Sequence, residues 1–129
     1  LLRVFRECRV VMHRAIYDLG WLTTTWDLPV PERLDDTMVQ EFTLSENELT
    51  YSLDDVCRRR GVPGKDESAL RQAAQAHGLD PKSEMWKLPA RFVGSYAEQD
   101  ARATLELSAR LLPQIEAQDC TEAYRLEMD

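Results

Sequence analysis

Tyr96 and Asp100 are the two residues whose types and spacing first suggest chemistry in this sequence. They are four positions apart, so on a helix both side chains project from the same face. Ser95 with Glu98 fits the S-x-x-E capping box, which predicts that a helix begins with Tyr96 in its first turn. A phenol and a carboxylate presented together could position a water beside a bound metal ion. They could equally be a buried tyrosine hydrogen-bonded to its neighbour, so the pair alone leaves the choice open.

Asp18 is a second carboxylate at a position that suits a site. Residues 9–13 predict a short buried strand, and residues 15–27 return to helical spacing. Open α/β sheets bind ligands just beyond the carboxyl ends of their strands, which is where Asp18 falls. The alternative is a first-turn aspartate that offsets the helix dipole, worth about 0.5 kcal/mol. For Asp18 taken alone, that structural interpretation is the better one.

The composition is that of an ordinary domain from a reducing compartment. The 129 residues are 43% hydrophobic and 30% charged, which suits one domain with its own core. The formal charge of −7 argues against a protein that coats nucleic acid, but not against an enzyme whose carboxylates meet nucleic acid through metal ions. Cys8, Cys57 and Cys120 form no C-x-x-C pair, so neither a zinc site nor a disulfide framework is expected. We expect a cytoplasmic protein without a membrane segment.

The other elements are predicted from caps, turns and apolar spacing. A helix should end near residue 8, and a second strand should cover residues 34–42. Further helices should cover residues 53–60, 67–77 and 96–112, with Pro113 kinking or ending the last of these and a final helix after Asp119. Because two strands do not make a stable sheet, we expect a helix-rich α/β fold whose first sheet strands are missing upstream. Both ends read as interrupted helices, so we expect a piece of a longer chain.

The candidate residues, taken together in their order, resemble a known family. Residues 13–22 (HRAIYDLGWL) resemble the second motif of the DEDD 3′–5′ exonucleases. Residues 96–100 resemble their third motif, Tyr-x-x-x-Asp, in the tyrosine subclass. Residues 35–38 are similar to the strand that follows the second motif, and residues 123–129 resemble the segment that leads into a family A DNA polymerase. The resemblance covers nearly the whole chain.

This resemblance implies a fold and a reaction. The fold would be a partial ribonuclease H-like exonuclease domain over residues 1–117, truncated at both ends, with residues 118–129 starting a connector towards a polymerase domain in cis. The reaction would be proofreading hydrolysis at a single-stranded 3′ end of DNA, with RNA less expected, in a bacterial or phage-infected cell. Two Mg²⁺ or Mn²⁺ ions would stabilise the attacking and leaving oxygens.

The resemblance also implies roles for particular residues. Asp18 and Asp100 would be metal ligands, and Tyr96 would orient the attacking water. His13, Arg14 and Tyr17 would contact the nucleic acid, although a histidine at a strand end could also be a satisfied structural residue.

Two departures from the family pattern limit what the chain should do alone. The first motif of the family, Asp-x-Glu on an early strand, is absent from these residues, and Arg14 stands where the second motif has Asn. We therefore predict no nuclease activity for the isolated chain. Two alternatives stay open: an RNA-trimming exonuclease of the ribonuclease D kind, and a non-catalytic remnant of the exonuclease fold that serves as a binding or packing module.

Overall fold

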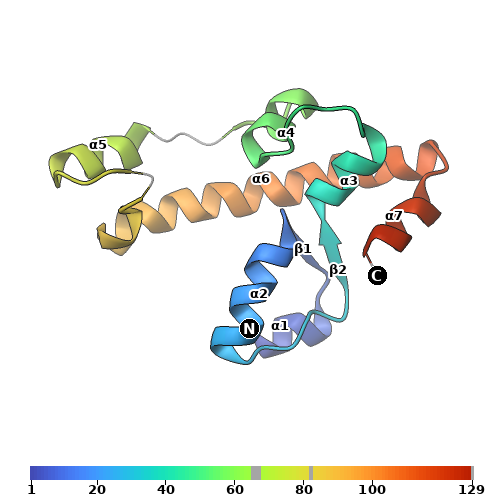
Figure 1. Cartoon of the computed structure of the whole chain (residues 1–129), viewed down its shortest axis with the longest axis horizontal. Helices are drawn as coiled ribbons and strands as arrows, with labels where there is room; N and C mark the ends of the chain where they lie inside the picture. Colours follow the sequence, from blue (N-terminus) through green and yellow to red (C-terminus); the bar gives the residue numbers. More distant parts are fainter. Residues whose placement is uncertain (65–67, 82, 129) are drawn as a thin grey trace.

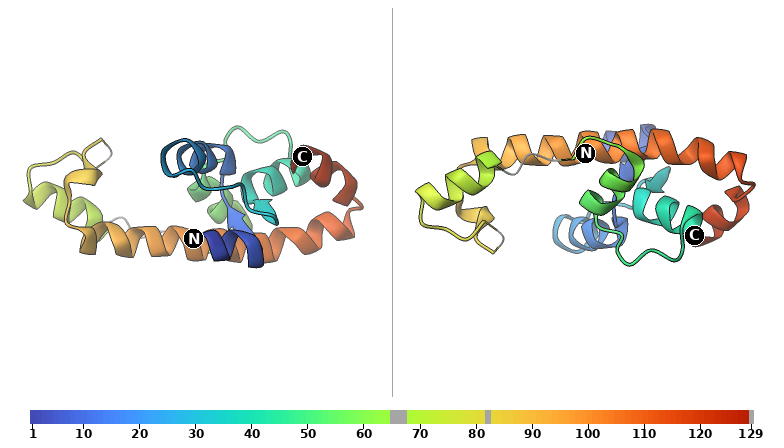
Figure 2. Two further views of the ribbon diagram at one scale, coloured as in Figure 1. Left: turned by 90° about the horizontal axis from the view of Figure 1, so that it is seen from below. Right: turned by 90° about the horizontal axis from the view of Figure 1, so that it is seen from above.

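The computed structural model describes residues 1–64, 68–81 and 83–128, and Figure 1 shows how the long helix α6 runs the length of the molecule. The elements in chain order are α1 (Leu2–Glu7), β1 (Val10–Met12), α2 (Ala15–Trp26), β2 (Leu34–Asp36), α3 (Thr37–Leu44), α4 (Leu53–Arg60), α5 (Ser68–Ala76), the 3₁₀ helix η1 (Met85–Lys87), α6 (Ala90–Ala117) and α7 (Thr121–Met128). In both views of Figure 2, α3, α4, α5 and α7 lie on the same side of α6. Helix α6 is therefore the element against which the others are arranged.

Strands β1 and β2 form a parallel pair joined through α2, which makes a β–α–β unit. In the register of the pair, Val10 lies opposite Leu34 and Met12 lies opposite Asp36. The strand predicted for residues 9–13 is confirmed, but its residues are half-buried rather than buried. Because the strands are parallel, both end at the same edge of the sheet. The first turn of α2 and the start of α3 therefore meet at that edge.

The second strand is shorter than the sequence predicts. It ends at Asp36, and the next residues form α3, so the prediction of a strand as far as residue 42 was wrong beyond this point. The Asp36 carboxylate caps α3 by accepting the backbone N–H of Met38 at 2.8 Å. Gln40 and Glu41 are then both buried against the rest of the domain. An N-terminal cap and a buried helical face outweigh the alternating pattern that suggested a strand.

Helix α6 begins at Ala90 rather than at Tyr96, so the predicted capping box at Ser95 was wrong. Ser95 lies inside the helix, and Pro89 precedes the first helical residue. The helix extends upstream because Phe92, Val93 and Tyr96 form a partly buried stripe on its first turns. This stripe packs against a small buried cluster made of Leu70, Ala73, Ala74 and Leu88. Tertiary packing thus sets this helix start, and a local cap does not.

A second apolar cluster fixes α4 on the middle of α6. It consists of Val56, Cys57, Val62, Ala103, Leu107 and Leu111. Pro113 does not end α6, which continues to Ala117. The buried Ile115 lies four residues after Leu111, so it extends the same packed face past the proline.

The remaining predicted helices are present. Ser52 caps α4 by accepting the N–H of Asp55 through its hydroxyl, and Gly61 ends it with a positive φ of 67°. Helix α5 is observed from Ser68, and the predicted first residue Glu67 lies outside the described residues. The predicted helix-rich α/β fold class is confirmed, and the described strands form a small parallel sheet. In the part of the chain that the structure describes, no helix is long and apolar enough to cross a membrane.

Candidate functional site

The turn from β1 into α2 is held by one buried carboxylate. Arg14 adopts a left-handed backbone conformation (φ 62°, ψ 52°) just before the first residue of α2. Its N–H donates to Asp36 Oδ1 at 2.9 Å, and the N–H of Ala15 donates to Asp36 Oδ2 at 2.6 Å. These bonds satisfy two backbone donors at the start of α2, which have no partner within the helix. The first turn of α2, with Tyr17 and Asp18, is thereby placed at the carboxyl edge of the sheet.

Asp18 and the three residues predicted to contact nucleic acid line one cavity. The cavity measures about 600 Å³ and is bounded by His13, Arg14, Tyr17 and Asp18 on one side and by residues that include Met38, Tyr51 and Leu53 on the other. Partial burial and the nearby Asp36 carboxylate raise the pKa of Asp18, while His13 lowers it. Desolvation and a like charge both disfavour a carboxylate, so a cation bound here would relieve an existing electrostatic cost.

His13 joins three parts of the fold at this edge. Its Nε2 lies 2.9 Å from the carbonyl of Tyr51, so this nitrogen carries the hydrogen that is donated. Its Nδ1 lies 2.8 Å from Thr37 Oγ1. Burial lowers the pKa of His13, against the opposing effects of the Tyr51 carbonyl and of the Asp36 and Asp100 carboxylates. The imidazole thus connects β1 to α3 and to the loop before α4.

Asp100 approaches His13 from α6, and Tyr96 lies one turn earlier on the same helix. Both are half-buried, and Asp100 Oδ1 is fully covered. Tyr96 packs against the apolar cluster around α5, while the backbone carbonyl of Asp100 accepts from Thr104 Oγ1 at 2.8 Å. Helix α6 packs across β1, and the Asp100 carboxylate is near enough to act on the pKa of His13.

The two aspartates predicted as metal ligands therefore share an electrostatic neighbour. His13 responds to the charge of Asp100 and itself acts on Asp18. Carboxylate oxygens are the ligands that Mg²⁺ and Mn²⁺ prefer, so the donor chemistry fits such an ion. Across residues 1–64, 68–81 and 83–128, however, no three histidine, cysteine, aspartate or glutamate side chains are arranged to hold a metal ion. The described residues provide part of a donor set rather than a complete one.

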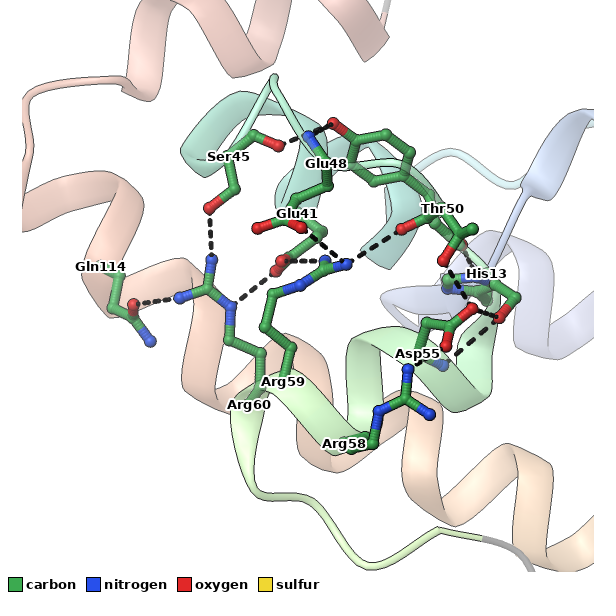
Figure 3. A network of polar contacts seen from close by, with 12 residues as sticks. His13, Glu41, Ser45, Glu48, Thr50, Asp55, Arg58, Arg59, Arg60 and Gln114 are labelled. Carbon is green, nitrogen blue, oxygen red and sulfur yellow. Dashed lines mark hydrogen bonds and ion pairs between the residues drawn. The ribbon is translucent and has the colours of Figure 1, made fainter.

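A buried ion cluster beside the site was not found by the sequence interpretation. Glu41 is fully buried and accepts from Arg59 Nη1 and from Arg60 Nε, both at 2.7 Å (Figure 3). Arg60 also donates to Gln114 of α6 and to Ser45. In the run of three arginines only Arg58 is well exposed. Glu41 could have indicated this cluster, but it lies in a segment that the sequence predicted as a strand. Its pairing with Arg59 and Arg60 becomes evident only once residues 37–44 are recognised as a helix.

The fold agrees with the class of protein to which comparison with known sequences assigns this chain. Open α/β sheets place their chemistry at the carboxyl edge of parallel strands, which is where β1 leads into α2. Residues 1–116 match the family described as 3′–5′ exonuclease, which is the exonuclease domain of family A DNA polymerases. The chain belongs to this family.

Two phage proteins are similar to this chain. A "DNA-directed DNA polymerase" of Pseudomonas phage M6 is 42% identical over 92 residues, which cover 71% of this chain and 14% of that protein. "DNA polymerase DpoZ" of Acinetobacter phage SH-Ab 15497 is 25% identical over 129 residues, covering 96% of this chain and 21% of that protein. The chain thus spans only a small part of the length of both relatives. No solved structure matches it significantly.

Proposed function

We propose that this chain is part of the proofreading exonuclease of a phage DNA polymerase, which removes nucleotides from a single-stranded 3′ end of DNA inside the infected cell. The family match over residues 1–116 supports the reaction class, and the names of both relatives support DNA over RNA and a polymerase domain in cis. In the proposal, residues 118–129 begin the connector towards that domain.

Each site residue has a role in this proposal. Asp18 and Asp100 would hold the divalent ions, and Tyr96 would orient the attacking water. Arg14 and Tyr17, exposed residues that line the cavity, would contact the phosphate and the sugar or base of the terminal nucleotide. His13 remains a predicted contact, although both of its ring nitrogens are engaged within the protein. Bound Mg²⁺ or Mn²⁺ supplies the charge that stabilises the attacking and leaving oxygens of phosphodiester hydrolysis.

The observation that supports the proposal is that α2 begins directly after β1, while α6 packs across the same strand. Asp18 follows the strand, Asp100 lies on the helix that packs across it, and His13 interacts with both carboxylates. Desolvation and the nearby Asp36 carboxylate raise the pKa of Asp18, so a cation bound beside it would favour its charged form. A site for metal-assisted hydrolysis would supply that cation.

The direct test is release of nucleotides by the full-length protein. A DNA strand labelled near its 3′ end and carrying a terminal mismatch should be shortened stepwise in Mg²⁺, and a chelator should stop the reaction. An RNA strand of the same sequence should be shortened more slowly. Failure to shorten the DNA strand would contradict the proposal, and a preference for RNA would favour the ribonuclease alternative.

The isolated chain should be inactive in the same assay, because it contains no Asp-x-Glu pair and its described residues gather no complete donor set. Robust cleavage by the chain alone would contradict this. The incomplete donor set also keeps the non-catalytic alternative open. Calorimetric titration with Mn²⁺ of the full-length protein and of its Asp18→Asn, Asp100→Asn double variant separates the two, because a polymerase domain binds divalent ions of its own. Mn²⁺ binding that is lost in the double variant supports the nuclease, and equal binding by both proteins supports the remnant.

A further inference from the structure

Asp36 makes an unusual set of contacts for a residue outside the predicted site. Its side chain is almost fully buried, and its two oxygens accept three backbone N–H groups from two different helices. Oδ1 accepts from Arg14 and from Met38, and Oδ2 accepts from Ala15. One carboxylate therefore caps α3 and also fixes the start of α2.

The contacts with α2 reach the residues on which the proposed chemistry depends. Arg14 and Ala15 are the last residue before α2 and its first residue, and Asp18 lies within the same turn. The left-handed backbone at Arg14 is unfavourable for a residue with a Cβ, so it needs a fixed partner to persist. The Asp36 carboxylate supplies this partner through the N–H of Arg14.

We infer that Asp36 is a positioning residue of the exonuclease site, an inference that rests on the proposed function. It touches no substrate or metal ion in this account. It sets the direction of the first turn of α2, and thereby the placement of Tyr17 and Asp18 relative to Asp100 on α6. Misplacing a reacting group by about 1 Å can cost about a hundredfold in rate, so this placement has a measurable consequence.

The atoms of Asp36 allow a selective disruption. In Asp36→Asn the amide oxygen can stay at Oδ1 and keep accepting from Arg14 and Met38. The amide nitrogen then replaces Oδ2 and faces the N–H of Ala15, which loses its acceptor. Asn is as good an N-terminal cap as Asp, so α3 keeps its cap. Asp36→Ser, which retains one acceptor for Met38, serves the same purpose should Asp36→Asn fail to fold.

Asp35→Asn is the matched control. Asp35 is the neighbouring residue of the same strand and is equally buried, but its carboxylate is held by Arg9 and by the hydroxyl of Tyr124 on α7. It has no contact with the start of α2 among the hydrogen bonds of the described residues. Its replacement removes a buried charge from β2 without releasing α2.

The test compares these variants in the full-length protein at a temperature where all remain folded, with DNA synthesis as the check on folding. Asp36→Asn should lower the exonuclease kcat about tenfold or more while KM changes less than about twofold. Hydrogen–deuterium exchange should become faster in the peptide containing Ala15 and stay unchanged in the peptide containing Met38. Asp35→Asn should leave both kcat and the exchange at Ala15 unchanged.

The outcomes separate the two claims. An unchanged kcat or an unchanged exchange at Ala15 in Asp36→Asn overturns the positioning role while the proposed function stands. An equal loss of kcat in Asp35→Asn also overturns it, because the effect would then be general destabilisation. A wild-type protein that synthesises DNA but has no exonuclease activity overturns the proposed function itself, and the positioning role with it.

Discussion

Arg14 and His13 show how single residues shape the candidate site. Arg14 stands where the resembling family motif has Asn, and its backbone is left-handed. Asn enters this conformation more readily than Arg, so the family preference has a backbone reason in addition to any contact with substrate. The positive φ could not be read from the sequence, because nothing local marks an arginine as left-handed. It follows from the contact with Asp36, which is distant in sequence.

Arg14→Asn should therefore stabilise the domain. We expect the free energy of unfolding to rise by about 0.5–1 kcal/mol, since the left-handed conformation costs most residues about 1–2 kcal/mol. Urea unfolding of both proteins measures the change. Arg14→Ala is the control, because alanine removes the guanidinium but keeps the strain. An equal gain in Arg14→Ala would show that charge, rather than backbone conformation, is responsible.

His13 should make stability depend on pH. Its unfolded pKa is about 6.5 and burial lowers its folded pKa, so both states are neutral well above pH 6.5. As the pH falls through about 6.5, the unfolded chain takes up a proton that the folded chain resists, and the free energy of unfolding decreases.

The measurement is urea unfolding at several pH values between about 7 and 5. His13→Gln should flatten this dependence. The same slope in wild type and His13→Gln would mean that His13 is not the group responsible.

At the scale of elements, the sequence predicted those parts of the fold whose signals are local. The helix at residues 53–60 was correct because Ser52 and Gly61 mark its ends. Helix α3 was missed because residues 34–42 alternate in polarity, while the buried partners of Gln40 and Glu41 come from α4, α6 and α7. The start of α6 was misplaced for the same reason, since its first turns depend on packing against α5.

The ion cluster of Glu41 should be a main stabilising contact between α3 and α4. Glu41→Gln leaves Arg59 and Arg60 facing an amide in a buried region, so we expect a loss of about 3 kcal/mol. The control is Glu106→Gln, which removes an ion pair with Arg110 whose side chains are 44% and 42% exposed. That change should cost less than about 0.5 kcal/mol by thermal or urea unfolding. Similar losses in the two variants would show that the cluster has no special weight.

At the scale of the whole molecule, α6 unites the parts of the proposed site. It carries Tyr96 and Asp100, packs across β1 and holds α4 and α5 through two separate apolar clusters (Figure 1). Helix α7 returns to α3 and β2, where Tyr124 donates to Asp35 at 2.8 Å. The pairing of Asp18 with Asp100 stays a prediction from motif order and resemblance, whereas the contacts of His13 with Thr37 and Tyr51 and of Asp36 with the start of α2 became evident only in the three-dimensional arrangement.

The central claim is that Asp18 and Asp100 act in one site. A double-mutant cycle in the full-length protein tests it most directly, using the exonuclease kcat of Asp18→Asn, Asp100→Asn and the double variant, with DNA synthesis as the folding control. Each single variant should lose at least about a hundredfold in rate, and the double variant should lose little more, because residues that act as a unit are not additive. If the two losses multiply in the double variant, or if either single variant keeps full activity, the two aspartates do not form one site and the account is wrong.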